Sequence, residues 1–67
     1  MHTYAWTIIA FRQDEKKNVS YANYLFCSQA PTVADLEMEI QKALDEKFPE
    51  VDGWFERSYL ILGITVE

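Results

Sequence analysis

The sequence predicts an α+β fold in which one helix packs on one face of a three-stranded antiparallel sheet. Three observations support it. Residues 2–12 and 19–28 alternate as strands and are rich in β-branched and aromatic residues. Residues 33–48 carry apolar side chains at helical spacing, and residues 58–66 return to a strand pattern. The 67-residue chain is predicted to be one domain, residues 1–67, near the lower size limit for independent folding.

The first two predicted strands are joined by residues 12–18, RQDEKKN, a polar segment suited to a hairpin loop. The segments TYAWTIIAF and YANYLFC within these strands carry apolar or aromatic residues on both alternating faces. A half-solvated antiparallel sheet normally has one polar face. The pattern therefore predicts that both faces are covered, although the chain offers only one helix for this purpose.

A helix is predicted from Val33 to Phe48. Thr32 followed by Asp35 fits a weak form of the capping box, in which the Thr side chain satisfies a free backbone N–H group. Pro49 ends the helix because proline disfavours helical geometry in the residue before it. The apolar stripe lies on one side of the helix and consists of Val33, Leu36, Ile40, Ala43, Leu44 and Phe48.

The third strand is predicted at residues 58–66, SYLILGITV, after a turn at Asp52-Gly53. Its even-numbered residues are expected to lie under the helix, and these are Leu60, Leu62, Ile64 and Val66. With the helix stripe they would form the core. A right-handed crossover from the second strand through the helix predicts the order β-β-α-β along the chain and 3-1-2 across the sheet.

The periodicity leaves open which face of the first two strands packs on the helix. If the even-numbered residues face the helix, the uncovered face carries Ile9, Phe11, Tyr21, Leu25 and Ile61. If the odd-numbered residues face it, the uncovered face carries the candidate self-association set Tyr4, Trp6, Tyr24, Phe26 and Tyr59. Either face is a contiguous apolar patch that predicts an interaction site, and a homodimer is expected. The alternative is that loop residues, including Trp54 and Phe55, fold over the sheet.

The net charge of −5 is unevenly distributed. Residues 1–31 carry three basic and two acidic residues, whereas residues 32–67 carry three basic and nine acidic residues. An acidic surface is expected to bind a basic protein rather than duplex nucleic acid or an anionic membrane. The predicted partner-binding residues are Asp35, Glu39, Asp45, Glu46, Glu50, Asp52, Trp54 and Phe55.

The titratable residues form no catalytic or metal-binding pattern. His2 is the only histidine, and a zinc site needs three or four ligands. Cys27 is the only cysteine, has no general base near it in the sequence, and fits a reducing compartment such as the cytoplasm. The sequence therefore predicts a non-enzymatic cytoplasmic protein without cofactor or metal, and with neither a signal peptide nor a membrane span.

These observations favour a small protein-binding module. The expected function is that of a phage- or mobile-element-encoded inhibitor, which docks on and blocks a bacterial protein, such as one that handles nucleic acid, in the host cytoplasm. The alternative is a small oligomeric module that binds a nucleotide or single-stranded nucleic acid on an aromatic sheet face. Such modules pair aromatic residues with basic ones, and the available basic residues are few: Arg12, Lys16, Lys17 and Arg57.

Overall fold

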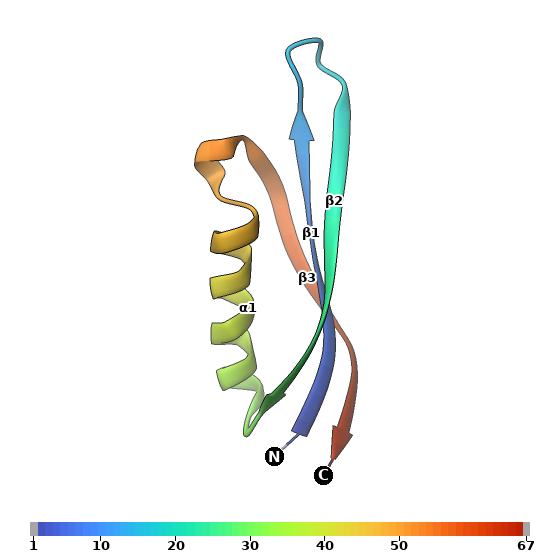
Figure 1. Ribbon diagram of the computed structural model, residues 1–67, viewed down its shortest axis with the longest axis vertical. Coiled ribbons are helices and arrows are strands. Elements are labelled where there is room, and N and C mark those ends of the chain that lie inside the picture. The colour runs from blue at the N-terminus through green and yellow to red at the C-terminus, as the bar shows by residue number, and fades with distance from the viewer. Residues whose placement is uncertain (1, 67) are drawn as a thin grey trace.

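A computed structural model describes residues 2–66 of the chain. Within this part, the elements follow in the order β-β-α-β, with a short 3-10 helix before the last strand (Figure 1). They are β1 (His2–Gln13), β2 (Val19–Ala30), α1 (Val33–Lys47), η1 (Glu50–Asp52) and β3 (Trp54–Val66). β1 lies between β2 and β3 and is antiparallel to both. The predicted fold class and strand order are confirmed.

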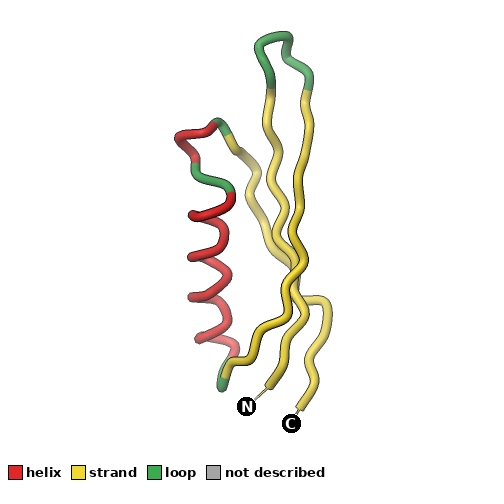
Figure 2. Tube along the Cα trace, in the orientation of Figure 1, coloured by secondary structure: helices red, strands yellow, loops and turns green. Residues whose placement is uncertain are grey.

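The molecule is long and thin. Its extents are 48 × 18 × 12 Å and its radius of gyration is 13.6 Å, against about 11 Å for a compact domain of this length. Figure 2 shows the β1–β2 hairpin extending beyond α1 and β3. The accessible surface is 4879 Å², whereas a compact monomer of this mass exposes about 4,400 Å². An unusually large part of the sheet is therefore left uncovered by the chain itself.

The core lies between α1 and the face of the sheet that carries the even-numbered residues of β1. Tyr4 and Trp6 are only 2% and 1% exposed, and Ile8 and Ala10 are also fully buried. Trp6 stacks on Phe26 of β2, with ring centroids 4.4 Å apart. The helix contributes the buried side chains Leu36, Ile40 and Leu44, followed by Phe48. This packing shows that the even-numbered residues of β1 face the helix.

Local signals position α1 as the sequence predicted. The Thr32 hydroxyl accepts a 3.2 Å hydrogen bond from the backbone N–H of Asp35 and donates one of 2.7 Å to the Asp35 carboxylate. The backbone N–H of Phe48 donates to the carbonyl of Leu44 at 2.9 Å, and Pro49 follows. The predicted cap and the predicted helix are confirmed, with the end one residue earlier.

β3 is longer than predicted because it begins at Trp54 rather than at residue 58. Phe55 lies directly opposite Phe11 near the end of β1. Glu56 then adopts a φ of 52° at one of two irregularities in the β1–β3 ladder. Because Glu56 and Arg57 interrupt the apolar alternation, the sequence pattern hid this part of the strand.

The second irregularity changes the phase of β3. Gly63 lies opposite Ala5, but Ile61 lies opposite the next residue of β1, Trp6. Leu62 is therefore an additional residue on the β3 side, as in a β-bulge. A bulge shifts the alternation of side chains between the two faces, so a simple even–odd assignment fails across it.

The bulge overturns the predicted contribution of β3 to the core. Residues directly opposite each other in a ladder share a face, so Ile61 points to the helix side and packs against the core. Leu60, opposite Thr7, belongs to the other face. The prediction of burial was wrong for three exposed residues, Leu60, Leu62 and Ile64. The bulge accounts for Leu60 and Leu62, whereas Ile64 lies opposite Tyr4 on the helix side and is nevertheless 55% exposed. The side chain of Val66 lies outside the described part of the chain.

Candidate protein-interaction surfaces

The face of the sheet opposite α1, here called the open face, consists of the odd-numbered residues of β1 and the residues opposite them in β2 and β3. Figure 1 shows α1 on the other side of the sheet. Leu25 and Leu60 are 69% and 60% exposed. The ring of Phe11 lies 6.3 Å from those of Tyr21 and Phe55. Two rows across the sheet carry most of the apolar surface: Leu25–Thr7–Leu60 and Tyr21–Phe11–Phe55.

The paired positions of the open face carry no Asp, Glu, Lys or Arg. β2 contains no charged residue along its whole length, and its register with β1 is unbroken. The charged residue of β1, Arg12, has even parity and places its guanidinium 5.5 Å from the Trp54 ring. The nearest acid along β3 is Glu56, which is unpaired at its irregularity. Proteins usually protect exposed edge strands with charged side chains, and the edge strand β2 carries none.

The self-association set predicted from the sequence lies on the wrong side of the sheet. Tyr4 and Trp6 are buried beneath α1. The ring of Tyr24 lies 5.6 Å from that of Phe48, and the Tyr59 hydroxyl donates to a Glu37 carboxylate oxygen at 3.4 Å. The prediction of a free face formed by Tyr4, Trp6, Tyr24, Phe26 and Tyr59 was wrong, because α1 packs on that side.

The other set that the sequence allowed largely occupies the open face. Ile9, Phe11, Tyr21 and Leu25 have open-face positions, whereas Ile61 belongs to the helix side. Among residues 2–66, the segment before β3 does not cover the open face. Trp54 packs on Phe48 with ring centroids 4.9 Å apart, which places it beside the core rather than over the open face. Phe55 lies in the open face and is itself exposed.

A second surface, here called the acidic surface, is formed by the carboxylates of α1 and η1. Residues 33–52 hold seven acidic residues and two lysines, a net charge of −5 that equals the net charge of the whole chain. The remaining charges cancel. The acidic surface lies on the helix side of the molecule, so charge and the open face are segregated onto opposite sides (Figure 1).

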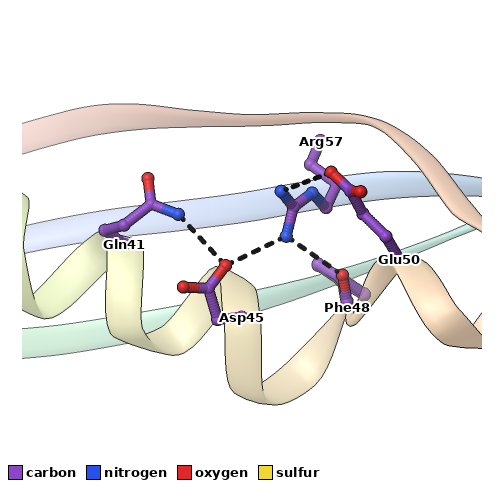
Figure 3. A network of polar contacts seen from close by, with 5 residues as sticks. All are labelled: Gln41, Asp45, Phe48, Glu50 and Arg57. Atoms are coloured by element: carbon purple, nitrogen blue, oxygen red, sulfur yellow. Dashed lines mark hydrogen bonds and ion pairs between the residues drawn. The ribbon is translucent and has the colours of Figure 1, made fainter.

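Two predicted partner-binding carboxylates are already used within the chain (Figure 3). Arg57 donates from Nη1 to Asp45 Oδ1 and from Nη2 to Glu50 Oε1, both at 3.2 Å. Nη1 also donates to the carbonyl of Phe48 at 3.3 Å, and Gln41 donates to Asp45 at 3.1 Å. This network ties the C-terminal end of α1 to β3, and it partly neutralises Asp45 and Glu50.

The other predicted acids differ in how free they are. Glu39 accepts a 3.1 Å hydrogen bond from Ser28 Oγ, which itself accepts one of 3.0 Å from the indole N–H of Trp6. The Asp35 carboxylate belongs to the helix cap described above. Glu46 and Asp52 are exposed, and their carboxylates have no hydrogen-bond or ion-pair partner among the described residues. These two carboxylates are the ones most available to a partner.

A groove of about 340 Å³ runs between α1 and β2. Its floor is apolar, and its rim alternates glutamates with lysines: the lining is Trp6, Phe26, Ala43, Glu39, Lys42, Glu46 and Lys47. The Lys47 ammonium lies 5.4 Å from the centre of the Tyr24 ring, which engages it in a cation–π contact. An apolar floor with two carboxylates and two lysines on its rim suits a side chain with an aliphatic stem and a charged end.

Titratable groups elsewhere are isolated. His2 is partly buried beside Tyr4, with ring centroids 6.1 Å apart, and Cys27 is exposed on the open face. Among residues 2–66, no group of three or more His, Cys, Asp or Glu side chains could hold a metal ion. No helix in the same range is long and apolar enough to cross a membrane.

Comparison of the chain with protein-family models, with curated proteins and with solved structures finds no match. The surfaces are therefore interpreted from their own geometry. Sequence reasoning missed two parts of that geometry, the role of Arg57 and the groove floored by Trp6 and Phe26. Both depend on contacts between segments distant along the chain, which no local pattern encodes.

Proposed function

We propose that this chain is a non-enzymatic protein-binding module that docks on a basic surface of a larger protein through its acidic surface. The observation that carries the proposal is that the entire net charge of −5 resides on residues 33–52, on one side of the molecule. Such segregation steers a basic partner to one face and orients it on approach. Steering by charge is screened by salt, which makes the proposal testable.

The groove supplies the contact area that charge alone lacks. A lysine or arginine of the partner can place its aliphatic stem on the floor formed by Phe26 and Ala43 and its charge beside Glu39 or Glu46. Met38 is 73% exposed on the outer side of α1 and offers a flexible apolar contact beside this acidic flank. Apolar anchors surrounded by complementary charge are the usual composition of a protein interface.

Occlusion is the proposed consequence of docking. A 67-residue module that presents one charged side has the means to cover a functional surface rather than to carry out chemistry. We therefore propose an inhibitor of a bacterial protein, encoded by a phage or other mobile element. A target that binds nucleic acid would present a suitable basic surface, because phosphate binding depends on clustered Lys and Arg.

Binding of nucleotides or single strands gains no support from the described residues. The exposed aromatic row of the open face, Tyr21–Phe11–Phe55, lies among uncharged paired positions. The larger aromatic group around Trp6 is buried under α1. Stacking modules need cations beside their aromatic residues to hold the phosphate backbone, and the paired positions of the open face lack them.

The decisive experiment compares two charge-reversed double variants. Glu46→Lys with Asp52→Lys alters the acidic surface at carboxylates that have no internal partner, whereas Glu15→Lys with Glu56→Lys makes the same charge change elsewhere. Each tagged protein is used to capture proteins from a bacterial lysate across a salt series. The proposal expects one or more proteins to be retained by the parent and by the Glu15/Glu56 variant, and lost from the Glu46/Asp52 variant.

We expect capture to weaken steadily with added salt. In surface-based kinetics, the retained protein should associate more slowly with the variant in which Glu46 and Asp52 are reversed than with the parent. Equal retention by both double variants would show that the acidic surface does not contribute to binding. Retention that disappears on nuclease treatment would instead favour nucleic-acid binding.

A further inference from the structure

We infer that the open face is the interface of a homodimer, in which two copies stack their sheets face to face with the α1 helices on the outside. The inference is independent of the proposed docking function, which uses the opposite side of the molecule. It rests on three features of the open face: the distribution of charge, the arrangement of large and small residues, and the exposed area. Each of them fits a second copy of this chain.

Charge favours self-association through this face over contacts that involve the acidic surface. Each chain carries −5, so contacts that involve the acidic surface would bring like charges together. The paired positions of the open face carry no charge, so two copies can meet there without desolvating a charged group. Stacked sheets about 10 Å apart, each with a helix outside it, leave the acidic surfaces on the order of 30 Å from each other. That separation exceeds the screening length of about 8 Å at physiological salt.

The open face is also complementary to itself. The aromatic row Tyr21–Phe11–Phe55 lies toward one end of it, and the small row Cys27–Ala5–Gly63 lies toward the other. Two rows lie between them, Leu25–Thr7–Leu60 and Asn23–Ile9–Ser58. A two-fold axis between these middle rows places the aromatic row of each copy over the small row of the other. Such a closed, isologous contact is the commonest arrangement of soluble homodimers.

The exposed area fits a dimer of moderate affinity. Tyr21, Phe55, Leu25 and Leu60 together expose on the order of 400 Å² of side chain, given that one aromatic side chain buries about 150–250 Å². With the smaller side chains between them, the face approaches the roughly 600 Å² per partner at the low end of stable interfaces. A monomer–dimer equilibrium in the micromolar range is therefore expected.

A substitution at Gly63 tests the dimer without disturbing the packing of the single chain. A Cβ built at Gly63 meets no atom within 4 Å, so a side chain there has open space in the monomer. In the inferred dimer, the aromatic row of the second copy occupies this space. Leu25→Lys and Gly63→Lys should therefore each raise the dimer dissociation constant about tenfold or more, because a lysine charge would be desolvated in an apolar contact.

The matched controls are Met38→Lys and Val51→Lys, which add the same charge at exposed apolar residues outside the open face. Sedimentation equilibrium of the full chain, with circular dichroism as a check of folding, measures the constants. The expected result is a dimer for the parent and both controls, with dissociation favoured only in the open-face variants. Cys27 gives a second readout, since its labelling by a maleimide should slow as the parent concentration rises.

Two results would overturn the inference. One is a parent protein that remains monomeric up to about 1 mM, a range in which even weak specific contacts form. The other is a dimer that persists in both Leu25→Lys and Gly63→Lys, which would point to pairing along the uncharged edge of β2. Neither result would affect the acidic surface, so the docking function would still be judged by its own charge reversals.

Discussion

Ile61 of β3 lies directly opposite Trp6 of β1, so the two side chains share the helix-covered face of the sheet, while Leu60 beside Ile61 points to the open face. This pairing predicts unequal effects of truncation. We expect Ile61→Ala to lower the free energy of unfolding by about 2 kcal/mol, because it leaves a cavity against the core. Leu60→Ala should cost less than about 1 kcal/mol in the isolated monomer.

Urea denaturation at low protein concentration measures both effects without contribution from a dimer. Equal losses at the two positions would contradict the bulge at Leu62. At high concentration, Leu60→Ala should lose additional stability, because its side chain belongs to the inferred interface.

The Arg57 network predicts a stabilising contact between α1 and β3. Arg57→Met keeps much of the aliphatic stem and removes the hydrogen bonds to Asp45, Glu50 and the Phe48 carbonyl. We expect a loss of about 1–2 kcal/mol, most of it from the partly buried carbonyl, because exposed ion pairs contribute little. Asp45→Asn should therefore cost clearly less. Thermal unfolding of both variants checks this, and a larger loss in Asp45→Asn would reverse the ranking.

The backbone at Glu56 predicts a stabilising substitution. Its φ of 52° falls in the left-handed region, which disfavours residues with a Cβ atom. Glu56→Gly should raise the free energy of unfolding by up to about 1 kcal/mol, since glycine adopts this conformation without strain. Glu56→Gln removes the same charge but keeps the Cβ atom, and it should leave stability nearly unchanged. If the two variants behave alike in denaturant melts, electrostatics rather than backbone strain is responsible.

The N-terminal cap of α1 predicts a chemical preference at Thr32. Its hydroxyl satisfies the backbone N–H of Asp35, so Thr32→Ala should cost about 1 kcal/mol. Thr32→Ser keeps the hydroxyl and should retain most of the stability. A melting temperature that is lowered equally by both variants would show that the methyl group matters more than the hydrogen bond.

The distribution of charge predicts negligible affinity for generic nucleic acid at physiological salt. No net positive charge remains outside the acidic surface, so few phosphate counterions would be released on binding. Fluorescence anisotropy with random single-stranded and duplex oligonucleotides should show no saturable binding. Tight, salt-sensitive binding would favour the nucleic-acid function over the protein-binding one.

The sequence by itself determined the elements whose signals are local. Thr32 and Pro49 bound a single amphipathic stripe, so the helix could be placed almost to the residue. Two apolar strands joined by a polar loop, followed by a helical crossover, left one simple strand order. The excess of apolar residues over the covering capacity of one helix also predicted an uncovered apolar face, and the concentration of acids after residue 32 predicted an acidic surface.

Only the tertiary structure decided which side of the sheet is open. The even-numbered and the odd-numbered residues of β1 are both largely apolar. The alternation of the strand therefore cannot show whether Trp6 and Ile8 or Ile9 and Phe11 face the helix. The choice is made by packing, because the stacked rings of Trp6 and Phe26 fill the space beneath α1. The bulge at Leu62 is likewise a property of a strand pair, and a single strand's pattern cannot contain it. The same holds for Arg57, whose partners are brought together only when the end of α1 meets β3.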